Sequence, residues 1–175
     1  MKILLIRHGE TTGDIEDKYG GAYDDHLTDL GREQLEITAK KLVGTNIDIM
    51  FSSTLIRARE SVEIINNTVG TKIEFVEGLR ERNYGILGGL TKTEALEKYP
   101  EAVESHKDPS NTDPDGEAQL DFIARVVGAF ELIIATQHEC IVILAHGGSL
   151  KVILNHLNLP LPDSIGDGEI IEVSI

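Results

Sequence analysis

Hydrophobic residues recur along the chain in two alternating patterns, short continuous runs and longer segments with helical spacing. The first run, residues 2–6, is uninterrupted by polar residues after its lysine, which is typical of a strand buried on both faces of a sheet. Further short runs predict four more strands, at residues 47–51, 72–76, 140–145 and 169–175.

Segments with apolar residues three or four positions apart lie between these runs and predict helices. Thr28 is a suitable N-cap for a helix that Gly44 would end, and the Ser-Ser-Thr sequence at residues 52–54 supplies candidate caps for the next one. Pro100 is expected to stop a short helix that Thr91 begins. Two later helices are predicted at residues 118–136 and 149–157.

One part of the chain carries little periodicity. Residues 78–89 hold four glycines and are predicted to be a loop. Residues 101–116 combine prolines and acids with almost no apolar residues, so we expect a surface excursion there. Between residues 101 and 121, seven Asp and Glu stand against one Lys, which favours a solvated rim over a cation site. We therefore expect a flap-like excursion over about residues 78–116.

Strands that alternate with helices predict an α/β fold, a three-layer α/β/α sandwich with a mostly parallel sheet. A length of 175 residues fits a single domain, residues 1–175. In parallel sheets, ligands bind at the carboxyl ends of the strands. The residues that follow each predicted strand are therefore the first candidates for a functional site.

Composition and charge exclude several classes of function. The net charge is −14, which disfavours partners such as nucleic acid and anionic membrane surfaces. The longest apolar runs are too short to cross a bilayer, and Arg7 and His8 follow the first run directly, unlike a signal peptide. The single cysteine, Cys140, allows no internal disulfide. We expect a cytoplasmic protein that draws any anionic substrate into a local basic pocket.

Two His-Gly pairs end predicted strands. Arg7-His8-Gly9 follows the first strand, and His146-Gly147 follows the fourth. Arg57 lies one turn into a helix whose free N–H groups favour an anion. Each motif alone is also compatible with ordinary surface residues. Together they place two histidines and two arginines at one edge of the sheet, an arrangement that suits an oxyanion.

Six short motifs, in order, cover essentially the whole chain. They are Leu5 to Thr11, Leu27 to Gln34, Ser52 to Ala58, Leu79-Arg80-Glu81, Asp115-Gly116-Glu117 and His146-Gly147-Gly148. In these residues the sequence resembles the histidine phosphatases, a family that includes the cofactor-dependent phosphoglycerate mutases. The resemblance implies the phosphoglycerate mutase-like form of the α/β/α sandwich.

The resemblance also implies phosphoryl transfer through a phosphohistidine. His8 would be the nucleophile, and Glu81 would act first as general acid and then as general base. Arg7, Arg57 and His146 would stabilise the charge on the transferring phosphoryl group, with the arginines able to fork onto two oxygens. The resemblance requires no metal, and no His or carboxylate spacing in the sequence suggests one.

Substrate contacts are implied at further positions. They are Arg7, Asp14, Gly21, Arg57, Arg82, Tyr84, Lys92, His146 and Gly147. Asp14 departs from the family, which commonly has Asn there, and its carboxylate would repel a phosphate unless it is protonated, turned away or paired with an arginine. A small phosphorylated substrate is the expected partner, and the protein is expected to be a monomer or a homodimer.

Two activities are compatible with this resemblance. The Glu81-to-Leu90 stretch looks like the mutases, which depend on 2,3-bisphosphoglycerate, whereas a phosphatase would need no cofactor. The interval from Thr91 to Gly116 contains no arginine, and the chain is shorter than those mutases. We therefore favour a phosphatase, with the mutase as the alternative. A weakly catalytic module that binds phosphorylated ligands is a third hypothesis, which the presence of an acid at Glu81 argues against.

Overall fold

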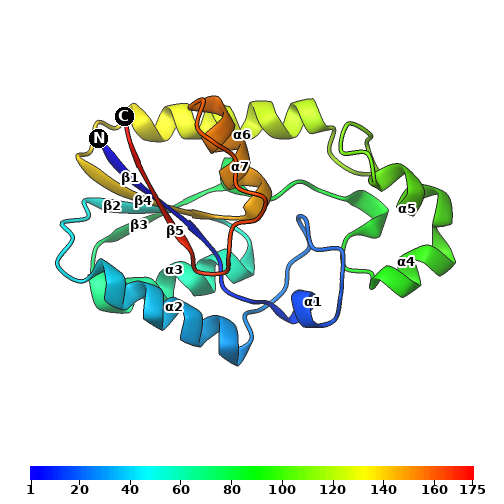
Figure 1. Cartoon of the computed structure of the whole chain (residues 1–175), viewed down its shortest axis with the longest axis horizontal. Coiled ribbons are helices and arrows are strands. Elements are labelled where there is room, and N and C mark those ends of the chain that lie inside the picture. Colours follow the sequence, from blue (N-terminus) through cyan, green and yellow to red (C-terminus); the bar gives the residue numbers. More distant parts are fainter.

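A computed structural model describes all residues of the chain, 1–175. Its centre is a five-stranded sheet in the order β3-β2-β4-β1-β5 (Figure 1). The strands are β1 (Lys2–Arg7), β2 (Ile49–Ser53), β3 (Lys72–Val76), β4 (Cys140–Ala145) and β5 (Ile170–Ser174). The first four run parallel, and β5 pairs antiparallel with β1. The predicted α/β fold class is confirmed, and all five predicted strands form within a few residues of their expected bounds.

Helices cover both faces of the sheet. The α-helices are α1 (Thr12–Ile15), α2 (Asp29–Leu42), α3 (Ile56–Val69), α4 (Lys92–Lys98), α5 (Pro100–His106), α6 (Gln119–Ile134) and α7 (Gly147–His156), with two 3-10 turns, Glu77–Leu79 and Gly85–Leu87. In Figure 1, α6 and α7 lie on one side of the sheet and α2 and α3 on the other. No helix is long and apolar enough to cross a membrane.

Each face of the sheet has its own core. Ile3 and Leu5 of β1 pack in the cluster that includes Phe130 of α6, whereas Leu4 and Ile6 pack in the cluster formed with α2 and α3. This division follows from the strand's period of two, which points successive side chains to opposite faces. Because both faces are covered, β1 needs apolar residues at every central position, as its sequence has.

Helices α2 and α3 begin in different ways. Thr28 caps α2 by accepting the Gly31 N–H, as expected. The predicted caps of α3 were wrong, because Ser52 and Ser53 belong to β2 and the N-cap position is Leu55, with no side-chain cap bond. Ser53 Oγ instead accepts the Leu55 N–H at 3.3 Å, so its hydroxyl remains near the end of the strand.

The excursion after β3 is more ordered than the sequence predicted. It contains α4 and α5, and Pro100 is the first residue of α5 rather than only the end of the preceding helix. Proline suits this position because its fixed φ is helical and its missing N–H would be unpaired there. A third apolar cluster, which includes Leu87, Ala95 and Ala102, holds these helices. The expectation of a fully solvated rim is also wrong at Asp113, which is 4% exposed.

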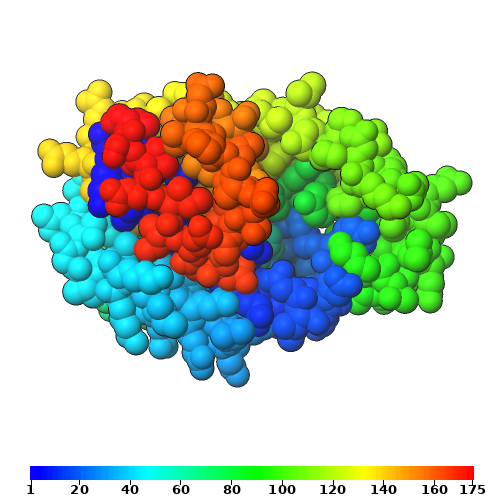
Figure 2. Space-filling model, in the orientation of Figure 1, coloured from blue at the N-terminus to red at the C-terminus, as the bar shows by residue number.

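This excursion lies beyond the carboxyl ends of the parallel strands. In Figure 1, α4 and α5 stand at the end of the molecule opposite the two chain termini. Figure 2 shows the surface hollowed where segments near residues 10–25, 80–120 and 147–156 meet. The parallel register therefore directs β1 and β4 toward a hollow that the excursion borders.

Candidate active site

The two predicted histidines face each other at the ends of neighbouring strands. Arg7 at the end of β1 pairs with Ala145 at the end of β4, and the His8 N–H donates to the Ala145 carbonyl at 3.1 Å. The ring centroids of His8 and His146 are 5.1 Å apart. Both residues are at most 5% exposed. Parallel pairing alone brings together two imidazoles that are 138 positions apart (146 − 8) in the sequence.

His8 is held in one orientation by its own loop. Its Nδ1 lies 2.8 Å from the Gly9 carbonyl, an acceptor, so Nδ1 carries the ring proton and Nε2 keeps its lone pair. Arg57 Nε donates to this Nε2 at 3.2 Å. Burial, followed by the nearby Arg57 cation, holds the pKa of His8 well below its usual value. A neutral imidazole with its lone pair on Nε2 can act as a nucleophile near neutral pH.

His146 is oriented through the other side of its ring. Ser53 Oγ lies 2.8 Å from His146 Nε2. His146 Nδ1 is buried without a hydrogen-bond partner. Burial lowers the pKa of His146 well below its usual value, and the Arg57 cation adds to this effect. The ring is therefore neutral.

Arg57 is anchored by several acceptors at once. Its Nη1 donates to the Tyr23 carbonyl at 2.7 Å and to Asp25 Oδ1 at 2.9 Å, and its Nη2 donates to the Gly21 carbonyl at 2.7 Å. The side chains of Arg57 and Asp25 are both 4% exposed. With Nε directed at His8, one N–H of Nη2 remains for a ligand. This geometry differs from the free two-oxygen fork that the sequence led us to expect.

Arg7 makes fewer contacts within the protein than Arg57 does. Its Nη1 donates to the Ile165 carbonyl at 2.6 Å and lies 3.2 Å from Asp167 Oδ1. Its Nε is buried without a hydrogen-bond partner. A buried donor left unpaired costs about 1–3 kcal/mol. Arg7 Nε is such a donor, and an anion that accepts from it would remove the cost.

Glu81 is positioned by the start of α7. Its Oε2 accepts the Gly148 N–H at 2.7 Å, and its Oε1 accepts the Arg82 N–H at 3.0 Å. A Cβ atom at Gly148 would lie 2.4 Å from Glu81 Oε1, so the second glycine of the His-Gly-Gly motif makes room for this carboxyl. A proton donor and acceptor is thus fixed close to the two histidines.

These side chains enclose a cavity of about 210 Å³. Its walls include nine of the residues predicted to act on a substrate: Arg7, His8, Asp14, Gly21, Arg57, Glu81, Tyr84, His146 and Gly147. Two neutral buried histidines, two arginines and one carboxyl around a single cavity match the histidine phosphatase arrangement. The sequence pattern of the histidine phosphatase superfamily (branch 1) matches residues 3–166. This chain belongs to that superfamily.

Relatives and solved structures agree with the family. A 2,3-bisphosphoglycerate-dependent phosphoglycerate mutase of Cytophaga hutchinsonii is 31% identical over 170 residues, covering 93% of this chain and 80% of the relative. Bacillus stearothermophilus YhfR superposes with a TM-score of 0.89 at 27% identity, covering 99% of this chain and 91% of that one. The predictions of a histidine phosphatase and of an enzyme, either a phosphatase or a phosphoglycerate mutase, are confirmed.

The fold is shared with structures that are more distant in sequence. The alpha-ribazole phosphatase of Shigella flexneri gives a TM-score of 0.90 at 22% identity and covers 100% of this chain and 91% of that one. At this identity the likeness supports the fold alone. The named mutases are thus sequence relatives, and the named phosphatase shares the fold.

Two residues predicted to contact the substrate, Lys92 and Arg82, do not line this cavity. Lys92 is outside the cavity, with its Nζ 3.2 Å from the centroid of the Tyr19 ring, and burial lowers its pKa. Arg82 is 7% exposed. Its guanidinium donates to the carbonyls of Pro109 and Glu117 at 2.7 and 2.9 Å and so anchors the excursion. Their roles in substrate binding remain predictions.

Tyr84 and Gly21 connect the excursion to the cavity of this histidine phosphatase. Burial raises the pKa of Tyr84 to about 12, with the Glu81 charge as the next cause, so its hydroxyl stays protonated. Gly21 has φ +55°, and a Cβ there would meet the Arg82 carbonyl at 2.6 Å. A left-handed backbone and close packing both require glycine at this position.

Asp14 lines the cavity but is turned toward its own helix. Its Oδ2 accepts the N–H and the hydroxyl of Thr11, both at 2.9 Å, and so completes a capping box. It does not pair with the site arginines, because Arg7 contacts Asp167 and Arg57 contacts Asp25. Of the alternatives raised from the sequence, pairing with a site arginine is therefore wrong, and the Asp14 carboxylate is held by Thr11.

Several site residues of this histidine phosphatase were missed from the sequence. Asp25 contacts Arg57, Ser53 contacts His146, and Lys18 lines the cavity. In the excursion, His106 pairs with the buried Asp113 at 2.8 Å. No spacing in the sequence distinguishes these residues from surface polar residues. Only the Ser-Ser pair within the second arginine motif could have drawn attention to Ser53.

Proposed function

We propose that this histidine phosphatase is a metal-independent phosphomonoester hydrolase that transfers a phosphoryl group from a small phosphorylated metabolite to His8 and then to water. The observation that carries the proposal is the convergence of Arg7, His8, Arg57, Glu81 and His146 on one cavity. A phosphoryl group in that cavity would meet the arginine cations and the Nε2 lone pair of His8. Phosphoryl transfer depends mainly on such positioning and charge stabilisation.

The first step breaks the ester bond. His8 Nε2 forms a bond to phosphorus while the bond between phosphorus and the ester oxygen breaks, and Glu81 gives its proton to the leaving oxygen. The alcohol departs, and the phosphoryl group stays on His8. Arg7, Arg57 and His146 face the oxygens on which negative charge increases.

The second step regenerates the enzyme. Glu81, now a carboxylate, takes a proton from a water molecule whose oxygen attacks phosphorus. The bond between phosphorus and His8 breaks, inorganic phosphate leaves, and both His8 and Glu81 return to their first protonation states. The Gly148 N–H holds the Glu81 carboxylate in place between the two steps.

The charges around the cavity favour a monoester over a bisphosphate. Three cations line it, Arg7, Lys18 and Arg57, together with the carboxylates of Asp14 and Asp25 and the carboxyl group of Glu81. Arg7, Lys18 and Arg57 each already contact a carboxylate. A phosphomonoester brings a charge of about −1.5 to −2. A 2,3-bisphosphoglycerate molecule brings two phosphates and a carboxylate, and these residues fit it poorly.

A cofactor-dependent phosphoglycerate mutase is the second candidate. It is supported by the names of relatives that are 31–33% identical to this chain. The Glu81-Arg82-Asn83-Tyr84-Gly85 stretch supports it as well. A weakly catalytic phospho-ligand binding module is the remaining alternative, and it would leave Glu81 without a role.

One experiment separates the three. The protein is incubated with 3-phosphoglycerate and with a panel of labelled phosphomonoesters, with and without 2,3-bisphosphoglycerate and after dialysis against EDTA. A hydrolase releases phosphate in excess of 2-phosphoglycerate, and its rate falls by less than about twofold in EDTA. It also carries an acid-labile label that the His8→Ala variant lacks. Stoichiometric interconversion that depends on the bisphosphate would establish the mutase, and absence of turnover and label would leave the binding module.

The cellular compartment, the partners and the oligomeric state of the enzyme are also part of the proposal. Cys140 is free and buried, which suits a reducing cytoplasm. The net charge of −14 disfavours nucleic acid and anionic membranes as partners. We expect a monomer or a homodimer, and gel filtration with light scattering distinguishes them.

A further inference from the structure

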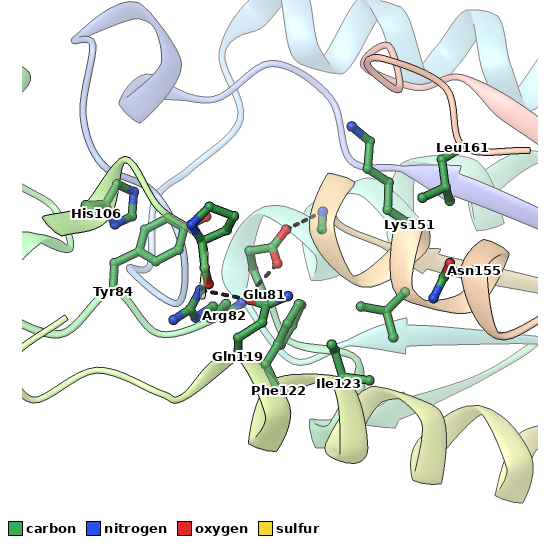
Figure 3. A pocket seen from close by; sticks show the side chains of 13 residues that line it. Glu81, Arg82, Tyr84, His106, Gln119, Phe122, Ile123, Lys151, Asn155 and Leu161 are labelled. Atoms are coloured by element: carbon green, nitrogen blue, oxygen red, sulfur yellow. Dashed lines mark hydrogen bonds between the residues drawn. The ribbon is translucent and has the colours of Figure 1, made fainter. Parts of the chain in front are cut away.

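A second, larger cavity adjoins the first at Glu81 and Tyr84, which line both. Its volume is about 430 Å³. Figure 3 shows Phe122 and Ile123 of α6 on one side, Lys151 and Asn155 of α7 on another, and Tyr84 with His106 at the far end. The two cavities thus meet at the carboxyl group that would protonate a leaving alcohol.

The walls of the second cavity are apolar on two sides. Phe122 and Ile123 come from α6, Val152 from α7 and Leu161 from the loop that follows α7. Phe122 is 3% exposed and belongs to the main core, so this wall is backed by packed side chains. A ligand that fills the space gains about fourfold in affinity for each methylene it buries.

The polar groups in the second cavity disfavour a second anion on the ligand. The Arg82 guanidinium donates to the carbonyls of Pro109 and Glu117 and to the Gln119 amide oxygen. Lys151 Nζ donates to the Asp163 carbonyl at 2.6 Å, and Glu81 adds a carboxyl at the mouth. No pair of free cations is available to hold a carboxylate such as that of glycerate.

We propose that this second cavity holds the alcohol portion of the substrate, and that the enzyme prefers phosphomonoesters of uncharged alcohols that carry an aromatic or similarly sized apolar ring. The inference rests on the proposed hydrolase, because it places the phosphoryl group beside His8 and the ester oxygen beside Glu81. Beyond Glu81, the ring would lie among Ile123, Val152 and Leu161. The apolar wall then determines which alcohols are accepted.

The test compares esters whose leaving oxygens are chemically alike. The values of kcat/KM for 3-phenylpropyl phosphate, propyl phosphate and glycerol 3-phosphate are measured, so that only the part entering the second cavity differs. We expect the phenylpropyl ester to exceed the propyl ester by about thirtyfold or more, since a ring buries the area of several methylenes. A ratio near one, with clear hydrolysis of propyl phosphate, overturns the inference and leaves the hydrolase intact.

Substitutions in the wall test whether the preference for the phenylpropyl ester arises in the second cavity. Ile123→Asn and Val152→Asn should each lower the phenylpropyl-to-propyl ratio by about tenfold, because a polar amide replaces apolar wall. Leu120→Asn is the matched control, since Leu120 lies on the same helix, is 79% exposed and lines neither cavity. Thermal melting confirms folding of each variant. An equal fall in the ratio for the control, or no fall in either cavity variant, contradicts the inference.

A binding measurement tests the apolar subsite even if the protein hydrolyses none of the esters. Calorimetry compares 3-phenylpropylphosphonate with propylphosphonate, which have no ester bond to hydrolyse. Tighter binding of the phenyl compound, lost in Val152→Asn, supports the cavity assignment. Equal affinities refute it. Absence of hydrolysis for every ester, with retained preference for the phenyl compound, refutes the hydrolase and keeps the apolar subsite.

Discussion

Ser53 Oγ lies 2.8 Å from His146 Nε2, at the end of β2 and inside the site. The same oxygen accepts the Leu55 N–H at 3.3 Å, so its own hydrogen is free to point at the imidazole. We infer that the hydroxyl donates to Nε2, which would leave the proton of the neutral ring on Nδ1, a buried atom without a hydrogen-bond partner. Ser53 is therefore a positioning residue that selects the donor tautomer of His146.

Replacing this hydroxyl should affect the chemical step more than binding. We expect Ser53→Ala to lower kcat by about tenfold with a smaller change in KM. A lost transition-state donor costs a few kcal/mol at most, because the ring can still sample the correct tautomer. Nitrogen NMR of His146 should show the tautomers mixed. Ser52→Ala is the control, since Ser52 is equally buried and bonds only the Ser53 and Ala58 carbonyls. Equal loss in both variants would mean a merely structural effect.

Gly148 should tolerate no side chain. A Cβ there would lie 2.4 Å from Glu81 Oε1, so Gly148→Ala displaces the carboxyl, and we expect turnover to fall by about two orders of magnitude. The nearest atom to a Cβ at Gly147 is Arg7 Nε at 4.0 Å, so Gly147→Ala should cost less. Gly128→Ala, where a Cβ meets nothing within 4 Å, controls for general effects of the substitution. Similar rates for the Gly148 and Gly128 variants would contradict the assignment of Glu81.

Asp14 should weaken the affinity for phosphate. Its carboxylate lines the cavity and is bonded to Thr11 rather than to an arginine, so it opposes an incoming dianion. Because the side chain is exposed, water screens much of the repulsion, and we expect Asp14→Asn to bind inorganic phosphate about two- to fivefold more tightly. Competitive inhibition at pH 8 and pH 5 measures this, with a smaller gain at pH 5, where inorganic phosphate carries one negative charge rather than nearly two.

A matched control is available three residues later. Asp17 is exposed, does not line the cavity and has φ +51°, a conformation that Asn accepts. Asp17→Asn removes the same charge from the same surface and should leave phosphate affinity unchanged. Identical gains for the two variants would indicate a change in net charge rather than an effect of Asp14 within the site.

Folding stability should decline in mild acid. Burial and the facing Arg7 and Arg57 cations lower the pKa of both His8 and His146 below the usual value near 6.5. The unfolded chain therefore binds more protons below pH 6.5 than the folded one. The free energy of unfolding is at its full value above pH 6.5 and falls as the pH drops, by up to about 2.7 kcal/mol per pH unit for two protons.

Urea unfolding at pH 7.5, 6.5 and 5.5 tests this window before most carboxylates titrate. His8→Asn should reduce the dependence by about one proton, because one of the two buried imidazoles is gone. A free energy of unfolding that stays constant from pH 7.5 to 5.5 in the native sequence would show that these rings do not remain neutral in the folded state.

The excursion shows where the sequence pattern was insufficient. Its order depends on Leu87, Ala95 and Ala102 packing with Tyr19, a residue more than sixty positions earlier in the chain than any of them. The helix that begins at Thr91 was predicted, but small apolar residues such as Ala102 stand among acids and give no periodic signal, so residues 101–116 were expected to be solvated. The buried Arg82 completes the anchoring through carbonyls of the chain itself, which no sequence pattern identifies.

The sequence by itself determined the sheet, the family and the meeting of the candidate site residues at one place. Uninterrupted apolar runs can be buried only in a sheet covered on both faces, and parallel strands bring Arg7, His8 and His146 to one edge. The tertiary structure alone decided how those groups are tuned. Asp25 anchors Arg57 and Ser53 orients His146, through contacts that join polar residues at least 32 positions apart. Such pairs leave no periodic trace, because burial and hydrogen-bond geometry arise only when distant segments pack together.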